Sequence, residues 1–322
     1  MTDPSTPPSV LIIGAGELGT AVLEALAKHP KRNGGRIAVL LRPPTTTTIT
    51  DDPANKKAKV VEHIHSLDAT LETADVATAS VADLAAVFAR YDVVVACAGF
   101  GLPAGTQVKV TRAALLAASA GKRMRYIPWQ WGIDYDVVGQ GSAQDLFDEQ
   151  LQVRQLLRSQ SQLGWTIAST GLFMSFLFLP AFGVVDIKGE TVRALGGWDR
   201  KITLTAARDI GRMAAVVVYE PRGEEEEEGV VYVAGDTVTY ARVAELVEGR
   251  FGGEWKREVW TEEGLKERLK ENPEDGMLKY ASVWAKGDGV AWEMEETLNR
   301  RRGVEMMGLE GYLREMAMGD VE

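Results

Sequence analysis

The chain has 322 residues, of which 45% are hydrophobic and 25% charged, and its formal net charge is −10. These values are ordinary for a globular protein of about two domains. They exclude a general nucleic-acid binder, because affinity for a phosphate backbone needs clustered cations. Any phosphate site must therefore be local, built from backbone amides and one or two basic side chains.

Targeting, membrane and metal signals are missing from the sequence. No basic and apolar leader is visible, and the longest apolar run, 171–185, is broken by Pro180 and is shorter than the ~20 residues of a membrane span. The single cysteine, Cys97, excludes an internal disulfide framework. His63 and His65 alternate in a stretch that we interpret as extended, without further zinc ligands. We expect a cytoplasmic protein with no metal and no membrane partner.

The predicted elements alternate between strand and helix through the first half of the chain. Short apolar runs next to glycine or proline predict strands, and apolar residues three and four apart predict helices. In chain order we expect strand 9–13, helix 18–29, strand 36–41, exposed loop 45–55, weak strand 72–77, helix 81–90, strand 91–98, helix 108–120, strand 125–128, helix 143–160 and strand 165–169. This alternation predicts an α/β fold with a Rossmann doubly wound parallel sheet.

The second half of the chain is less regular. We expect a strand at 230–233, a helix at 240–250, and Thr261 as the N-cap of a charged helix. We therefore predict a Rossmann domain over 1–165. A smaller C-terminal α/β region over 166–322, partly interleaved with the first, would hold the substrate.

The first predicted strand leads into Gly14-Ala15-Gly16-Glu17-Leu18-Gly19, a GxGxxG motif that also opens a helix. Dinucleotide sites have this context: Gly14 would allow the tight turn, Gly16 the approach of the pyrophosphate, and Gly19 the packing of helix on strand. The amides of the first helical turn, which Glu17 and Leu18 begin, would favour the anion. The motif therefore predicts a dinucleotide site.

The end of the second predicted strand indicates which dinucleotide binds. NAD enzymes place a carboxylate there for the ribose hydroxyls, whereas this chain places Arg42, which suits a 2′-phosphate. Lys56 or Lys57 is a candidate second cation. The loop 98–100, Ala98-Gly99-Phe100, lies where such folds pass the ribose and nicotinamide. We predict NADPH as the cofactor.

Several further motifs carry a family resemblance. They are Leu41-Arg42, Asp92-Val93-Val94-Val95, Gln107, Arg125 to Asp134 with its Pro-x-x-x-Gly-x-Asp pattern, Leu146 to Glu149, Val153-Arg154 and Ser169 to Phe173. With the glycine motif, the chain resembles the isoflavone-reductase-like and NmrA-like branch of the atypical short-chain dehydrogenases, especially its fungal members. The resemblance implies hydride transfer from NADPH to an aromatic or enone-type secondary metabolite. It also implies cofactor contacts from Gln107, Pro128 and Trp129.

The resemblance fails at the residue that family reductases place beside nicotinamide and substrate. They carry a lysine in a Phe-x-x-Lys pattern, and after Phe147 this chain has Gln150 instead. A carboxamide can hold a substrate oxygen but cannot supply a proton near neutral pH. The proton would come from water, Tyr135 or Asp134, and Tyr135 is the better acid because it is still protonated at neutral pH.

Four apolar residues either line an apolar substrate pocket or pack in the core: Trp131, Phe173, Met174 and Phe178.

Three functions stay open. The chain is an NADPH-dependent reductase of a small molecule, an NmrA-like nucleotide-sensing protein without turnover, or a non-redox cyclase or isomerase. Substrate-dependent NADPH consumption separates the first from the others. The sequence leaves the oligomeric state undefined.

Overall fold

The computed structural model describes residues 6–43, 53–119, 124–222 and 228–316. The chain divides into two compact units, each built from several segments. The first unit comprises Met1–Trp129, Gln152–Ile167 and Ile210–Val230. The second comprises Gln130–Leu151, Ala168–Asp209 and Val231–Glu322.

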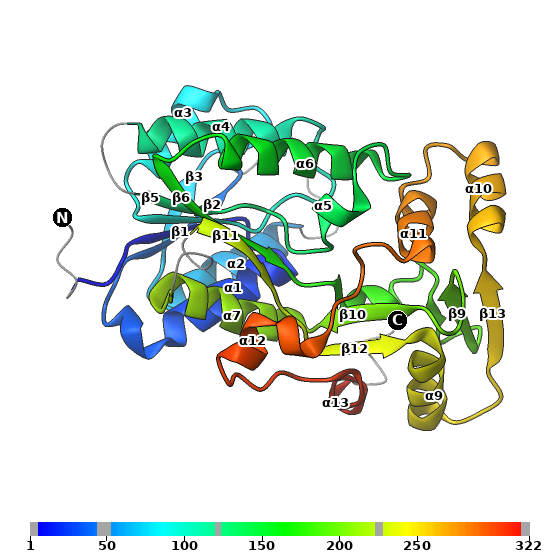
Figure 1. The fold of residues 1–322 in the computed structure, drawn as a ribbon. Helices are drawn as coiled ribbons and strands as arrows, with labels where there is room; N and C mark the ends of the chain where they lie inside the picture. Colours follow the sequence, from blue (N-terminus) through cyan, green and yellow to red (C-terminus); the bar gives the residue numbers. More distant parts are fainter. Residues whose placement is uncertain (1–5, 44–52, 120–123, 223–227, 317–322) are drawn as a thin grey trace. The chain divides into compact units, whose positions relative to one another are not determined.

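A seven-stranded sheet forms the centre of the first unit (Figure 1). Its strands are β1 (Val10–Ile13), β2 (Ile37–Leu41), β3 (Thr70–Thr73), β4 (Val93–Ala96), β5 (Met124–Ile127), β6 (Leu163–Ser169) and β11 (Glu228–Tyr232). They lie in the order β11-β6-β5-β4-β1-β2-β3, and every neighbouring pair from β6 to β3 is parallel. The order 3-2-1-4-5-6 is that of the Rossmann fold, so the predicted fold class is confirmed.

Helices cover both faces of this sheet, which is why its central strands are apolar throughout. The helices are α1 (Glu17–Lys28), α2 (Pro53–Ser66), α3 (Val81–Phe88), α4 (Thr106–Ala118), α6 (Asp145–Arg158) and α7 (Ala207–Tyr219), with a 3-10 turn η1 (Pro30–Arg32). One core joins α3, α4 and the end of α6 to one sheet face. Figure 1 shows α1 and α7 on the other face. There Gly211 lets α7 approach α1, since a β-carbon on it would lie 2.6 Å from the Ala21 carbonyl carbon.

The crossover between β2 and β3 differs from the prediction. His63 and His65 lie in helix α2 and not in an extended stretch, so that interpretation is wrong. Parallel neighbours need a long crossover, and α2 supplies it while burying Ile64. The predicted loop 45–55 falls mainly outside the described residues, and its last three positions begin α2. The weak strand predicted at 72–77 is β3, which starts two residues earlier and ends at Thr73.

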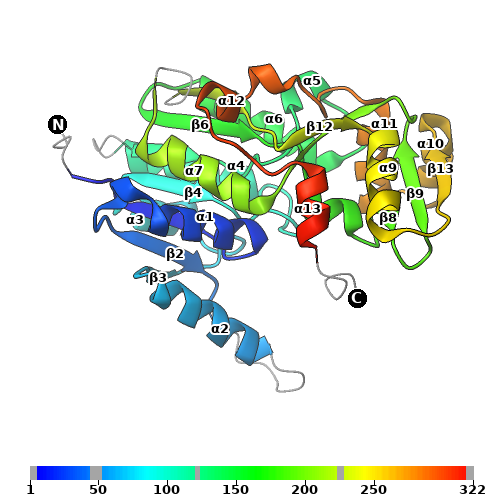
Figure 2. The same cartoon turned by 90° about the horizontal axis from the view of Figure 1, so that it is seen from below.

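The second unit contains two three-stranded sheets, ordered β12-β10-β7 and β13-β9-β8. Their strands are β7 (Leu172–Phe173), β8 (Val185–Asp186), β9 (Thr191–Leu195), β10 (Lys201–Thr205), β12 (Asp236–Thr239) and β13 (Lys256–Trp260). The helices are α5 (Tyr135–Val138), η2 (Met174–Phe178), α9 (Tyr240–Phe251), α10 (Glu262–Glu271), α11 (Gly276–Lys286), η3 (Met294–Glu296), α12 (Leu298–Arg301) and α13 (Leu309–Glu315). Figure 2 shows α9 beside β8 and β9.

The second unit has its own hydrophobic core, built from these sheets and from α9, α11 and α13. Thr261 caps α10 as predicted, because its side chain accepts a hydrogen bond from the Gly264 amide. Across the described ranges, no helix combines the length and the apolar character needed to cross a membrane.

Candidate functional site

The three glycines of the loop after β1 have different physical reasons to be glycine. Gly14 has a left-handed φ of 94°, and a β-carbon on it would lie 2.8 Å from the Ala98 β-carbon. A β-carbon on Gly19 would collide with the Gly14 carbonyl group. At Gly16, by contrast, a β-carbon would meet no atom of the described residues within 4 Å, and the residue is exposed. The fold therefore requires Gly14 and Gly19 but leaves open space at Gly16.

The start of α1 lies at the point where the strand order reverses. β1 is the strand from which the sheet extends to β2 on one side and to β4 on the other, and ligands of doubly wound sheets bind at the carboxyl ends of such strands. Gly16 is the N-cap of α1, and no side chain caps the helix there. Glu17 is exposed, whereas Leu18 is buried in the core. The helix start can therefore present backbone amides to an anion.

The loop after β4 is held from two sides. Gln107 of α4 is buried and donates a hydrogen bond from Nε2 to the Ala98 carbonyl oxygen at 3.1 Å. The Trp129 ring lies against Gly99, so that any β-carbon on Gly99 would overlap it. Phe100, which follows, is 58% exposed. The loop thus places Phe100 outward while its first two residues are fixed.

Arg42 directly follows β2, and its side chain is exposed at the end of that strand. Pro128 is buried behind the end of β5. Lys57 is exposed on α2, and the side chain of Lys56 lies outside the described residues. The first unit therefore carries every residue predicted to contact the cofactor.

In the second unit, Gln150 is the most unusual of the predicted site residues. It is fully buried in α6, and among the described residues neither Nε2 nor Oε1 of its side chain has a hydrogen-bond partner. Its backbone carbonyl, however, accepts a hydrogen bond of 2.8 Å from Nε2 of Gln130, which is also buried. The backbone of α6 is thus fixed at this turn, whereas the carboxamide of Gln150 has no hydrogen-bond partner among the described residues.

The segment 130–132 connects several of the predicted residues. The Gly132 carbonyl accepts hydrogen bonds from the amides of Thr170 and Gly171, at 2.8 and 2.9 Å. The Tyr135 hydroxyl oxygen lies 2.9 Å from the position that a β-carbon on Gly132 would take. The Thr170 hydroxyl is buried and, within the described part of the chain, has no partner. This polar segment therefore joins the residues after β5 to α5, α6 and the end of β6.

Both carboxylate oxygens of Asp134 accept hydrogen bonds from other parts of the fold. One caps α5 by accepting from the Asp136 amide at 3.1 Å, and the other accepts from the Tyr232 hydroxyl at 2.6 Å. A carboxylate held in this way fixes the loop before α5. Both carboxylate oxygens of Asp134 are therefore engaged in hydrogen bonds within the fold.

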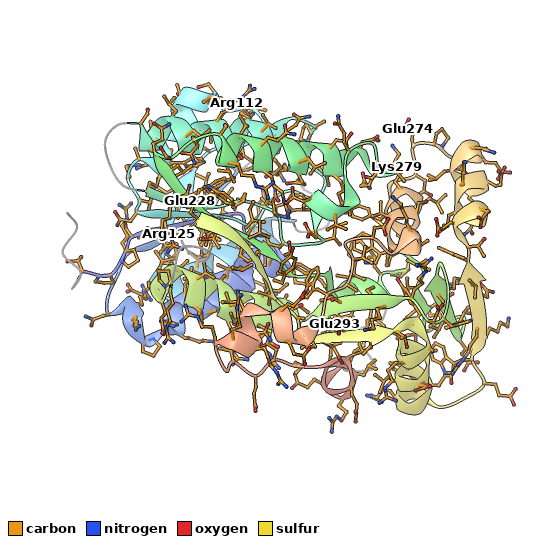
Figure 3. All side chains as sticks on the ribbon, viewed as in Figure 1. Arg112, Arg125, Glu228, Glu274, Lys279 and Glu293 are labelled. Carbon is orange, nitrogen blue, oxygen red and sulfur yellow. The ribbon has the colours of Figure 1, made fainter. Side chains whose placement is uncertain are left out.

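The first turn of α6, which precedes Gln150, is anchored in an aromatic cluster. The Phe147 ring packs against Tyr135, Tyr280 and Trp284, with centroid distances of 5.0, 5.5 and 6.3 Å. Burial raises the pKa of Tyr280 to about 12, so this phenol is neutral. Lys279, labelled in Figure 3, binds Asp145 of α6 at 2.5 Å and lies 3.8 Å from Glu274. Helix α11 therefore holds the beginning of α6.

The four residues predicted to line a substrate pocket have different surroundings. Met174 is fully buried in the core of the second unit, and Phe178 packs there against Tyr312 at 6.2 Å. Trp131 is 8% exposed and Phe173 is half-buried. Core packing thus accounts for Met174 and Phe178, and Phe173 is the most accessible of the four.

Two residues that the structure brings into this region were not singled out as site residues from the sequence. Gln130 stood only within the motif after β5, and Thr170 only within the motif after β6. A glutamine or a threonine by itself gives no local signal, because its role depends on partners far away in the chain. Among the residues described, no group of three or more His, Cys, Asp or Glu side chains is placed to hold a metal ion.

Comparisons with known proteins agree with this geometry. The model of the NmrA-like family matches residues 7–313. An NmrA-like family domain-containing oxidoreductase of Gibberella moniliformis is 48% identical over 309 residues, covering 96% of this chain and 98% of that protein.

Two solved structures share the fold. An isoflavone reductase aligns with a TM-score of 0.77 and 20% identity, covering 97% of this chain and 100% of its own. A leucoanthocyanidin reductase from Vitis vinifera, in a binary complex with NADPH, aligns with a TM-score of 0.76 and 18% identity, covering 95% and 98%. With the family model matching nearly the whole sequence, the chain belongs to the NmrA-like family.

Proposed function

We propose that this protein is an NADPH-dependent oxidoreductase that reduces an aromatic or enone-type small molecule. The observation that carries the proposal is the open space at Gly16. The fold has no need for a glycine at this N-cap position, so the missing side chain is explained by a ligand that approaches the backbone there. The first compact unit would bind the cofactor, and the second would bind the substrate.

The residues of the first unit fit NADPH. The amides at the start of α1 suit a pyrophosphate, and the exposed Arg42 suits a 2′-phosphate through charge-assisted hydrogen bonds. Ala98, Gly99 and Phe100 would lie along the ribose and nicotinamide. When bound, NADPH supplies the hydride, and the protein supplies binding, orientation and electrostatics. The activity named for the Gibberella moniliformis relative and the NADPH complex of the Vitis vinifera enzyme support this choice.

The second unit would orient the substrate. Gln150 can hold a substrate oxygen because its carboxamide has no other partner among the described residues. It cannot supply a proton near neutral pH, which leaves Tyr135 or water for that step. Asp134 would act as a positioning residue, since both of its oxygens are already used.

The test is substrate-dependent oxidation of NADPH by the purified protein across enones, quinones and phenolic ketones. The proposal predicts loss of NADPH absorbance with at least one of these classes, and stoichiometric formation of the reduced product. Binding of NADPH without turnover of any class would favour a nucleotide-sensing protein. Conversion of a substrate without net NADPH oxidation would instead identify a cyclase or isomerase.

A further inference from the structure

The buried carboxamide of Gln150 has both a hydrogen-bond donor, Nε2, and a hydrogen-bond acceptor, Oε1, and among the described residues neither has a partner. We propose that it selects a substrate whose carbonyl group has a hydroxyl group on the neighbouring carbon, so that the α-hydroxy enone is the preferred form of the enone class. This inference rests on the proposed function and deepens it. The preferred ligand can be identified by binding measurements alone, without any turnover of the substrate.

Among the described residues, no group forms a hydrogen bond with the Gln150 carboxamide. Gln150 is fully buried, and its backbone carbonyl already has its extra partner in Gln130. Of its neighbours on the buried side of α6, Phe147 and Val153 are apolar and Arg154 is charged, and none of the three is a hydrogen-bond partner of the carboxamide. A methionine or leucine would suit such a position without leaving a donor and an acceptor unpaired. The carboxamide is therefore explained by a partner outside the described chain.

That partner must offer both a hydrogen-bond acceptor and a hydrogen-bond donor. A glutamine side chain presents N–H donors and a carbonyl acceptor side by side in one plane. In either orientation of the amide, a plain ketone or enone pairs with Nε2 and leaves Oε1 buried without a donor. A hydroxyl group next to the substrate carbonyl donates to Oε1 while the carbonyl accepts from Nε2. Only the second partner satisfies both groups that the structure leaves unpaired.

The size of the preference follows from the cost of leaving Oε1 of Gln150 without a donor. A site built to pair with a substrate hydroxyl rejects analogues that lack it, because its own polar group is then left unpaired. For one neutral acceptor such as Oε1, we expect roughly a ten- to hundredfold preference for the hydroxy compound. A lysine at this position would have donors only, so it could not show this preference.

The experiment compares three ligands of one ring system: the α-hydroxy enone, its O-methyl ether and the unsubstituted enone. Dissociation constants are measured by calorimetry with NADP⁺ present, and kcat/KM is measured separately with NADPH. The hydroxy compound should bind at least about tenfold more tightly than both others. The unsubstituted enone shows that the loss with the ether is not caused by the bulk of its methyl group.

Variants then assign the preference to this side chain. Gln150→Met keeps the side-chain volume similar and removes both polar groups. The variant should therefore bind the hydroxy compound, its ether and the unsubstituted enone with similar affinities. Gln152→Leu is the matched control, because Gln152 is an exposed glutamine on the same helix, and it should keep the preference. If Gln150→Met does not fold, Gln150→Leu serves instead and should likewise remove the preference for the hydroxy compound.

The outcomes separate this inference from the proposed function. Equal affinities in the unmodified protein, or an unchanged preference in the folded Gln150 variant, would overturn the assignment even if NADPH is oxidised. Selective binding of the hydroxy compound without NADPH oxidation would support the assignment and would contradict the proposed reductase activity.

Discussion

The two glycines that flank the start of α1 should respond oppositely to the same substitution. Serine at position 16 meets open space, and the backbone there, with φ −78° and ψ −165°, is extended and accessible to any residue. Serine is also a preferred N-cap, and α1 has no side-chain cap now. Gly16→Ser should therefore change the free energy of unfolding by no more than about 0.5 kcal/mol.

Gly19→Ser puts the same atoms into a filled space. Its β-carbon would lie 2.8 Å from the Gly14 carbonyl carbon, whereas carbon atoms in contact are roughly 3.5 Å apart or more. Gly14 cannot easily retreat, because its amide donates to the Leu40 carbonyl oxygen at 3.1 Å and its φ is 94°. Helix α1 must shift from β1, and overpacking of this kind costs about 1–3 kcal/mol.

The assays are urea unfolding followed by tryptophan fluorescence and titration with NADPH. Gly16→Ser should unfold at the urea concentration of the unmodified protein but bind NADPH at least about tenfold more weakly, since a charged hydrogen bond alone is worth about 1.5–3 kcal/mol. Gly19→Ser should unfold at lower urea concentration. Unchanged NADPH affinity in Gly16→Ser would refute the argument from open space, and equal destabilisation by both variants would refute the packing argument.

Four further substitutions and one control variant test other parts of the molecule. Arg42→Ala should remove most of the preference for NADPH over NADH in calorimetric titrations, whereas Arg112→Ala, at an exposed arginine of α4, should not. If Tyr135 donates the proton, Tyr135→Phe should lower kcat by roughly a hundredfold or more and leave substrate affinity unchanged, and an unaltered kcat would exclude that role. Gly99→Ala should displace the Trp129 ring and lower the melting temperature, so a normal melting curve would contradict the contact between them. Burial lowers the pKa of His29 below its ordinary 6.5, so the folded protein binds fewer protons than the unfolded chain near that pH. The free energy of unfolding should therefore fall as the pH drops below it, and His29→Phe, which can keep the stacking on Tyr219, should weaken this pH dependence in urea titrations.

The α/β alternation and the glycine motif could be predicted from the sequence because both depend on neighbours in the chain. Buried parallel strands such as β1 and β4 are short, continuous apolar runs, and the turn after β1 needs glycine at Gly14 for its own backbone angle. The same local reasoning missed α2. Its β-branched and histidine-containing end resembles a strand, whereas in the structure it forms the helical crossover between the parallel strands β2 and β3.

The sequence by itself determined the fold class, the position of the dinucleotide motif and the glutamine at the place of the family lysine. The tertiary structure decided which of these residues have partners. The Gly14 carbonyl fills the space beside Gly19, whereas the space beside Gly16 is open among the described residues. Among the same residues the Gln150 carboxamide has no hydrogen-bond partner, although Gln130 binds the backbone carbonyl of Gln150. The physical reason is that packing and hydrogen bonding depend on residues that the folded chain brings together from distant positions, and no local pattern records those contacts.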